Sequence, residues 1–253
     1  MDPLEALDRD GFAVVADALP RDQVTALVRA VDRVWRERSL PGEPLHQLAF
    51  LGLDDAFLEP LDHPLVLPIV VGALGWNVFV YHCHLDVHPP LRAAAPVWGW
   101  HQDGGRQNVD LESPRPRLSV KAAYFLTDVA TPRHGALWVL PGSQRRDTLP
   151  RPDDPAARPP GAGPLLVRAG TAVVFDRRLW HARGENESDV VRKVLFYAYT
   201  YRWIRPRDDA GLTVQTLAAL TPVRRQLAGA GTGTFGHWFP SAEDAPLRAL
   251  AWE

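Results

Sequence analysis

The chain has 253 residues, of which 46% are hydrophobic, so it is long enough to bury a full core, and we expect one large domain. Its formal net charge is only −2, which argues against a polyanion-binding surface and therefore against a nucleic-acid partner. A single cysteine, Cys83, excludes an internal disulfide and every multi-cysteine zinc or iron–sulfur site.

The start of the chain and its apolar segments bear on cellular location. The first residues contain no basic stretch followed by an apolar run, so we expect no signal peptide. No uncharged apolar run reaches the length of a membrane span. The sequence therefore predicts a cytoplasmic protein without a membrane partner.

The first predicted elements are a short strand and a long helix. The residues G-F-A-V-V at 11–15 are typical of a strand. From Arg21 to Arg38, apolar side chains recur at three- and four-residue spacing, which predicts an amphipathic helix. These apolar residues are Val24, Leu27, Val28, Val31, Val34 and Trp35.

Polar and apolar residues then alternate between Asn77 and His88, which predicts a strand with two unlike faces. On a regular strand, one face carries Asn77, Phe79, Tyr81, Cys83, Leu85 and Val87. The other carries Val78, Val80, His82, His84, Asp86 and His88. Because a dry core does not accept that many polar groups, the second face lies in solvent or lines a wet catalytic cavity.

Further strands are predicted at residues 118–126, 136–140, 171–175 and 193–201, and a helical segment near 212–227. A helix near the start followed by many short strands predicts an α+β, mainly β fold with a sandwich or barrel of antiparallel strands. The proline-rich residues 145–164 interrupt strands of the same character, so we expect a long insertion in the β core.

The stretch V-W-G-W-H-Q-D-G-G at 97–105 suggests a metal site, because His101 and Asp103 point the same way on a strand. A third ligand is available in His181, just after the strand predicted at 171–175. Two imidazoles and one carboxylate leave open positions for O2 and a bidentate cosubstrate, as in non-haem Fe(II) oxygenases. Arg192, eleven residues further on, offers a guanidinium for the far carboxylate of 2-oxoglutarate.

A second H-x-D pair, His84 and Asp86, meets the same geometric requirement. Strand geometry alone therefore leaves the choice between the two pairs open.

The order and spacing of the motifs resemble the phytanoyl-CoA dioxygenase family of Fe(II)/2-oxoglutarate-dependent oxygenases over nearly the whole chain. The matching stretches are D-G-F-A-V-V-A-D-A-L-P-R-D-Q-V, W-H-Q-D, K-A-A-Y-F-L-T-D-V, H-G-A-L-W-V-L-P-G-S-Q and A-G-T-A-V-V-F-D-R-R-L-W-H, with L-T-P-V-R-R-Q-L-A-G resembling the tail of a bacterial branch. The resemblance implies a double-stranded β-helix, a cupin-like jelly-roll, with flanking helices. It also favours His101, Asp103 and His181 as the Fe(II) ligands over the second H-x-D pair.

The resemblance implies one oxygenase domain over residues 1–253. Within it we expect an N-terminal strand and helices at 1–75, the jelly-roll core at 76–205 with the insertion at 145–164, and a helical tail at 206–253.

Further residues are candidates for the cosubstrate and substrate pockets. Lys121 stands in an apolar strand, so we expect it to bind a 2-oxoglutarate carboxylate, unless its side chain reaches the surface. We expect Trp98 to border the 2-oxoglutarate pocket and Trp100 to lie in the core or outer wall. Arg183 stands where many family members have a serine that helps to bind 2-oxoglutarate. The candidates for the substrate pocket are Asp86, His88, Trp100 and Arg183.

The predicted activity is hydroxylation of a C–H bond of a small metabolite, with Fe(II), O2 and 2-oxoglutarate consumed to give succinate and CO2. Desaturation, ring closure and epimerisation remain open outcomes, and the aspartate of H-x-D argues against halogenation. The alternatives are a non-enzymatic jelly-roll binding protein and a cupin-like zinc or manganese enzyme that does not need Arg192. No basic cluster marks a CoA pocket, so the family name alone does not favour an acyl-CoA substrate.

Overall fold

The computed structural model describes residues 2–91, 99–105, 107–154, 156–209, 211–230 and 235–250. Its antiparallel strands form a six-stranded sheet in the order β1-β7-β4-β9-β3-β2 and a three-stranded sheet in the order β6-β5-β8. The large sheet contains β1 (Phe12–Val15), β2 (Leu45–Leu48), β3 (Val78–His88), β4 (Ser119–Phe125), β7 (Ala172–Asp176) and β9 (Arg192–Tyr201). The small sheet contains β5 (Leu137–Val139), β6 (Gly163–Leu165) and β8 (His181–Arg183).

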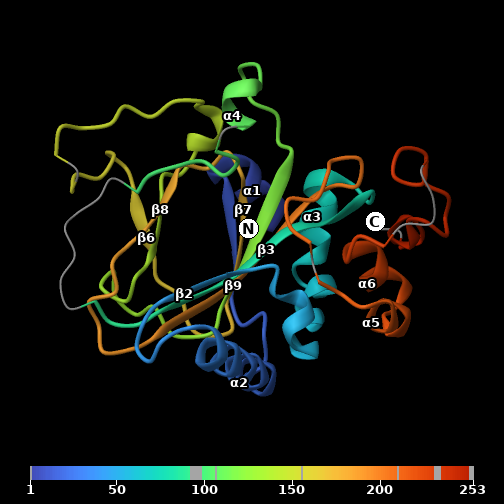
Figure 1. Cartoon of the computed structure of the whole chain (residues 1–253). Helices are drawn as coiled ribbons and strands as arrows, with labels where there is room; N and C mark the ends of the chain where they lie inside the picture. Colours follow the sequence, from blue (N-terminus) through green and yellow to red (C-terminus); the bar gives the residue numbers. More distant parts are fainter. Residues whose placement is uncertain are drawn as a thin grey trace.

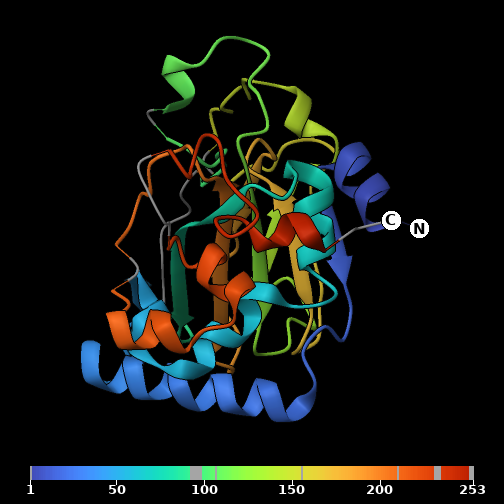
Figure 2. The same cartoon turned by 90° about the vertical axis from the view of Figure 1, so that its right-hand side faces the viewer.

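Most of the helices cover the face of the large sheet that points away from the small sheet. The helices are α1 (Pro3–Asp10), α2 (Arg21–Arg38), α3 (Leu67–Leu74), α4 (Gln107–Asp110), α5 (Val214–Ala219) and α6 (Pro222–Leu227), with 3-10 turns η1 (Phe50–Leu53), η2 (Asp55–Asp62), η3 (Ser143–Arg145) and η4 (Pro246–Ala249). The short helix α4 lies apart from this layer, at the top of Figure 1. Figure 1 shows α3, α5 and α6 on one side of β3 and β7, and β6 and β8 on the other. In Figure 2 these helices lie in front of the strands, and α2 runs across one end.

Two hydrophobic cores follow from this layering. The larger lies between the sheet and the helices and includes Leu27 and Val31 of α2 and Leu195 and Tyr197 of β9. The smaller lies between the two sheets and is built from residues such as Phe125, Leu137, Val173 and Phe196. The mainly β fold class with flanking helices is confirmed, and so is the helix predicted from Arg21 to Arg38.

The strict alternation expected along β3 is wrong on one side of a β-bulge. The register against β9 shifts between Val80 and His82, so Tyr81 is the extra residue. The side chains that lie in the larger core are therefore Val78 and Val80 before the bulge, and Cys83, Leu85 and Val87 after it. From His82 onward the prediction holds on both faces, because Cys83, Leu85 and Val87 lie in the larger core and His82, His84 and Asp86 line a cavity on the other face.

The helical segment predicted near 212–227 is in fact two short helices. Thr221 caps α6 by accepting a hydrogen bond from the Arg224 amide, and Pro222 is the first residue of that helix. A residue before proline is pushed out of helical geometry, and Thr221 is extended with ψ at 156°. The chain therefore breaks between Ala219 and Pro222.

In the part of the chain that the structure describes, no single helix is both long and apolar enough to cross a membrane. By length and composition alone, η2 and α3 together would be long and apolar enough, as a pair bent by 55°.

Candidate metal centre

His101, Asp103 and His181 come together where the chain after residue 98 runs beside β8. His101 and His181 form an antiparallel bridge in which each amide donates to the other residue's carbonyl at 3.0 Å. The Asp103 amide donates to the Arg177 carbonyl at 2.8 Å. Two neighbouring strand segments therefore fix all three residues through their backbones.

The potential ligand atoms of these three residues all lie within 4.8 Å of one another. His181 Nε2 is 4.0 Å from Asp103 Oδ1, and the rings of His101 and His181 are 4.3 Å apart at their centroids. His181 is buried, whereas His101 is exposed, so the cluster lies at the wall of a cavity that opens outward. The sequence analysis predicted that these three residues come together, and the structure brings them together.

Hydrogen bonds orient both imidazoles for metal binding. His101 Nδ1–H donates to the Gly99 carbonyl at 2.8 Å, and His181 Nδ1–H donates to the Leu179 carbonyl at 2.8 Å. Each bond places the proton on Nδ1, which leaves the Nε2 lone pair for a metal. The donor set of two imidazoles and a carboxylate therefore fits a divalent iron ion.

Charges around the cluster hold its carboxylate ionised and its buried imidazole neutral. Burial raises the pKa of Asp103, but Lys121, whose Nζ is 2.7 Å from Asp103 Oδ2, and His181 outweigh it and hold the pKa well below its usual range. Burial lowers the pKa of His181 to about 4. Both groups are therefore in the protonation state that a metal requires at neutral pH.

A clamp holds the loop that follows Asp103. Arg177 Nη2 and Asn108 Nδ2 both donate to the Asp103 carbonyl, at 3.2 and 3.1 Å. Gly104 has φ of +112°, and a Cβ there would lie 2.0 Å from Arg177 Nη2. Only glycine therefore allows the guanidinium to lie against this turn.

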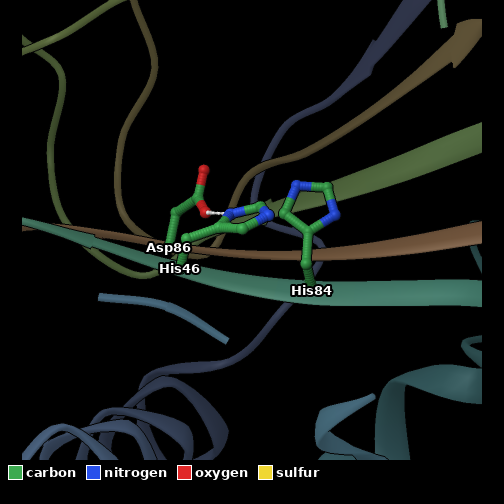
Figure 3. Close-up of side chains that lie close together, drawn as sticks. All are labelled: His46, His84 and Asp86. Atoms are coloured by element: carbon green, nitrogen blue, oxygen red, sulfur yellow. Dashed lines mark hydrogen bonds and ion pairs between the residues drawn. The ribbon is translucent and has the colours of Figure 1, made fainter. Parts of the chain in front are cut away.

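The second H-x-D pair also gains a third partner, because His46 on β2 stands opposite Asp86. Figure 3 shows the His46 ring between the Asp86 carboxylate and His84. The ligand atoms of these three residues also lie within 4.8 Å of one another. Here, however, His46 Nδ1 donates to Asp86 Oδ1 at 2.6 Å, and His84 Nδ1 is 3.0 Å from His82 Nε2. In this second cluster His46 is therefore bonded to the aspartate itself, and His84 to a histidine outside the cluster.

Both clusters line one cavity of about 250 Å³, together with Lys121, Arg183 and Arg192. Arg192 is buried, and among the described residues its Nε and Nη1 have no hydrogen-bond partner. Burial lowers the pKa of Arg192 to about 10, so it remains charged at neutral pH. An unpartnered buried guanidinium is costly, and an incoming carboxylate would satisfy it. The next residue, Lys193, instead pairs with Asp32 of α2 at 2.7 Å.

The other predicted residues lie in different places. The alternative that Lys121 reaches the surface is wrong, because its side chain is buried against Asp103. Arg183 Nη1 donates to His88 Nε2 at 2.6 Å, and Arg183 lines the cavity. Trp100 packs against Leu140 and Ala182. The prediction for Trp98 lies outside the described residues.

Among the polar residues of this cavity, sequence reasoning missed His46 and Arg207. The alternation in P-L-H-Q-L at 44–48 is a weak strand signal that would have drawn attention to His46. No local pattern marks Arg207, whose place depends on the path of the chain after β9.

Known proteins resemble this chain in sequence and in fold. The family model of phytanoyl-CoA dioxygenase (PhyH) matches residues 7–194. The iron/alpha-ketoglutarate-dependent dioxygenase ausU of Aspergillus calidoustus is 23% identical over 242 residues, which cover 89% of this chain and 79% of the relative.

Two solved structures share the architecture. The epimerase SnoN in complex with Fe3+, alpha ketoglutarate and nogalamycin RO has a TM-score of 0.62 at 19% identity, over 83% of this chain and 86% of that chain. HygX from Streptomyces hygroscopicus, with nickel and 2-oxoglutarate bound, has a TM-score of 0.64 at 14% identity, over 81% and 88%. These likenesses confirm the jelly-roll fold.

Proposed function

This chain belongs to the phytanoyl-CoA dioxygenase (PhyH) family, and from that premise we propose that it is an Fe(II)- and 2-oxoglutarate-dependent dioxygenase acting on a small molecule. His101, Asp103 and His181 would hold the iron, and Arg192 would hold the far carboxylate of 2-oxoglutarate. When bound, these groups supply the oxidative chemistry, in which O2 and 2-oxoglutarate are converted to succinate and CO2 as a substrate C–H bond is hydroxylated.

One observation carries the proposal. A cavity of about 250 Å³ holds two imidazoles with Nε2 left available, an ionised carboxylate and a buried guanidinium with two unpartnered nitrogens. Iron and a dicarboxylic acid together would use every one of these atoms. A binding protein without turnover gives no reason for this set of groups in one cavity.

The residues around the metal position it and keep water away. Lys121 binds one oxygen of Asp103 and so leaves the other oxygen for the metal. The Lys121 ammonium lies 5.7 Å from the Phe175 ring centroid and 5.8 Å from that of Phe196. These two rings form an apolar part of the cavity wall beside the ammonium.

Anaerobic titration with Fe(II) and then 2-oxoglutarate tests the proposal. The expected result is one bound Fe(II) per chain and a visible absorption band that appears only when 2-oxoglutarate is added. On admission of O2 with ascorbate, succinate should form in the wild type and not in His181→Ala. A chain that binds iron but gives neither the band nor succinate would contradict the proposal.

Hydroxylation is the proposed outcome, and product analysis has to separate it from its alternatives. One structural neighbour is named as an epimerase, so the same fold also serves another outcome. Incorporation of 18O from O2 into the product is expected for hydroxylation. Its absence, with succinate still formed, would indicate desaturation, ring closure or epimerisation.

We also propose that the whole chain works as one oxygenase domain. Each of the three parts distinguished in the sequence contributes to the same cavity: His46 from 1–75, the metal cluster from 76–205 and Arg207 from 206–253.

A further inference from the structure

Three cavities meet at one arginine. The metal cavity of about 250 Å³ and an adjoining one of about 280 Å³ share His82, Asp103, Lys121 and Arg207. Arg207 also lines a larger groove of about 680 Å³ between β3 and the C-terminal residues. A molecule lying in the outer groove can therefore reach the metal cluster past the Arg207 side chain.

The bulge in β3 holds Arg207 at this junction. The carbonyl of Tyr81, the bulged residue, accepts hydrogen bonds from the amides of Arg207 at 2.8 Å and Asp208 at 3.3 Å. Bulges commonly re-aim side chains next to active sites. The backbone of Arg207 is therefore fixed by β3, while its side chain remains 54% exposed.

Within the described residues, the guanidinium of Arg207 has only a weak acidic partner. Its Nε lies 3.9 Å from Asp208 Oδ1. The other oxygen of Asp208 is already hydrogen-bonded to His82 Nδ1 and to the Cys83 amide. Arg207 is thus free to bind an anion bidentately, which is the geometry that carboxylate and phosphate groups match.

The charge of the metal cavity also favours an anion. Its described lining has four cationic side chains, Lys121, Arg183, Arg192 and Arg207, but only two carboxylates, Asp86 and Asp103. Fe(II) and the 2-oxoglutarate dianion neutralise one another, so they leave this positive excess unchanged. The excess argues against a second metal at the His46, His84 and Asp86 cluster and for a negatively charged substrate.

The outer groove supplies flat apolar surface. Trp203 and Trp238 line it and are 43% and 62% exposed. Their rings are stacked at 6.0 Å with an interplanar angle of 27°, and Trp203 also stacks on Tyr201. Exposed aromatic side chains around a concave surface are typical of a ligand site, and indole faces pack well against planar rings.

We propose that Arg207 is the substrate-recognition residue and that the substrate is a small molecule with a carboxylate or phosphate group and a planar ring system, the anion on Arg207 and the rings against Trp203 and Trp238. This inference rests on the proposed function, because it assumes that the metal cavity is the reaction site. The anion on Arg207 would place the adjoining part of the molecule next to the metal cluster.

Matched naphthalene probes test the proposal by calorimetry. The probes are 2-naphthoate, 2-naphthyl phosphate and the neutral 2-naphthamide, each titrated into full-length protein with and without Mn(II) and 2-oxoglutarate. One of the two anions should bind about tenfold more tightly than the amide, because a charge-assisted bidentate pair is lost in the amide. Which anion binds more tightly distinguishes a carboxylate substrate from a phosphate substrate.

Variants decide whether Arg207 causes the preference. Arg207→Gln should reduce the preference for the anion to less than about twofold. In Arg207→Glu the preference should reverse, so that an additional cationic probe, 2-naphthylmethylamine, binds more tightly than the anion. The control Arg168→Gln removes an exposed arginine outside the groove and should keep the preference. Trp238→Ala should weaken all three probes several-fold.

Two results would overturn the inference: equal binding of anion and amide in the wild type, or a preference that survives in Arg207→Gln. Binding of Mn(II) and 2-oxoglutarate is measured separately, and its failure would count against the proposed function. Wild type and Arg207→Gln are also compared without Mn(II) and 2-oxoglutarate, and this comparison tests the inference even if they do not bind.

Discussion

The chain contains two clusters of two histidines and one aspartate in one cavity, and they differ in what their polar atoms already bind. In the cluster of His101, Asp103 and His181, both Nδ1 atoms are bonded to backbone carbonyls. In the cluster of His46, His84 and Asp86, the Nδ1 of His46 is bonded to the aspartate itself. Residue types are therefore the same in the two clusters, and the clusters differ in the groups that their Nδ1 atoms and their carboxylates bind.

From this difference we expect the groups bonded to the histidines and the aspartate to decide which cluster binds the metal. A carbonyl behind each imidazole orients Nε2 toward the metal and sets its tautomer. Both oxygens of Asp86 have a histidine neighbour, His46 Nδ1 at 2.6 Å and His88 Nε2 at 3.5 Å, whereas Asp103 keeps Oδ1 for an ion while Lys121 binds its Oδ2. The pKa of Asp86 reflects these neighbours, since burial raises it but hydrogen bonds from His46 and His88 outweigh burial and hold the pKa far below its usual range.

The largest expected effect separates the two clusters directly. His181→Ala and Asp103→Ala should weaken Fe(II) binding more than ~100-fold, because even loss of an outer partner costs about 10- to 100-fold. His84→Ala and Asp86→Ala should still bind one Fe(II) per chain. Metal content after dialysis, with circular dichroism to check folding, measures this. Loss of iron in His84→Ala but not in His101→Ala would contradict this assignment and place the metal at the cluster of His46, His84 and Asp86.

The next effect concerns the guanidinium that lies in the cavity with both clusters. Arg192→Ala should raise the 2-oxoglutarate concentration needed for half-saturation by ~30-fold or more, since removing one partner of a buried charge pair costs at least ~2 kcal/mol. Lys193→Ala is the matched control and should change it less than about twofold, because Lys193 faces Asp32 on the other side of the sheet. If Lys193→Ala had the large effect and Arg192→Ala the small one, the side chains of β9 would face the opposite sides of the sheet from those described here.

A smaller effect sharpens the role of Asp86. Asp86→Asn keeps the shape and the acceptor for His46 but removes a negative charge near Arg192. It should therefore tighten 2-oxoglutarate binding by about fivefold, equivalent to roughly 1 kcal/mol. Binding isotherms of the two proteins check the sign. Weaker binding together with lost iron would instead make Asp86 a metal ligand.

The smallest expected effect has the opposite sign. Arg183→Ser restores the hydroxyl that many family members carry, but removes a cation from the cavity wall. Because Arg183 is exposed and already donates to His88, we expect 2-oxoglutarate binding to weaken by only about threefold. A loss as large as that of Arg192→Ala would show that Arg183 is the main cosubstrate contact.

The elements that could be predicted from the sequence are those whose pattern is local. The helix at 21–38 and the strands that became β4, β7 and β9 each carry their own periodicity, and His101, Asp103 and His181 stand at fixed places relative to strands. Their association could be expected because neighbouring strand ends meet at one place in a sheet. The iron assignment itself came from the resemblance.

The rest depends on pairings over long distances in sequence. His46 reaches Asp86 because β2 pairs with β3, about 40 residues away, and nothing in a four-residue strand specifies that partner or its register. The bulge at Tyr81 cannot be seen in the alternating pattern either, because residues 78–81, V-F-V-Y, are hydrophobic on both faces of the strand. Arg207 depends on that bulge, so it could not be predicted either.

That bulge has a consequence for how the enzyme can change its substrate over evolution or in a directed library. Before Tyr81, Phe79 lines the outer groove; after it, His82, His84 and Asp86 line the metal cavity. A single strand is thereby divided into two stretches that can vary independently. Randomising the stretch around Phe79 should yield variants with new substrate ranges and intact cofactor use, whereas randomising the stretch from His82 onward should mostly yield inactive ones.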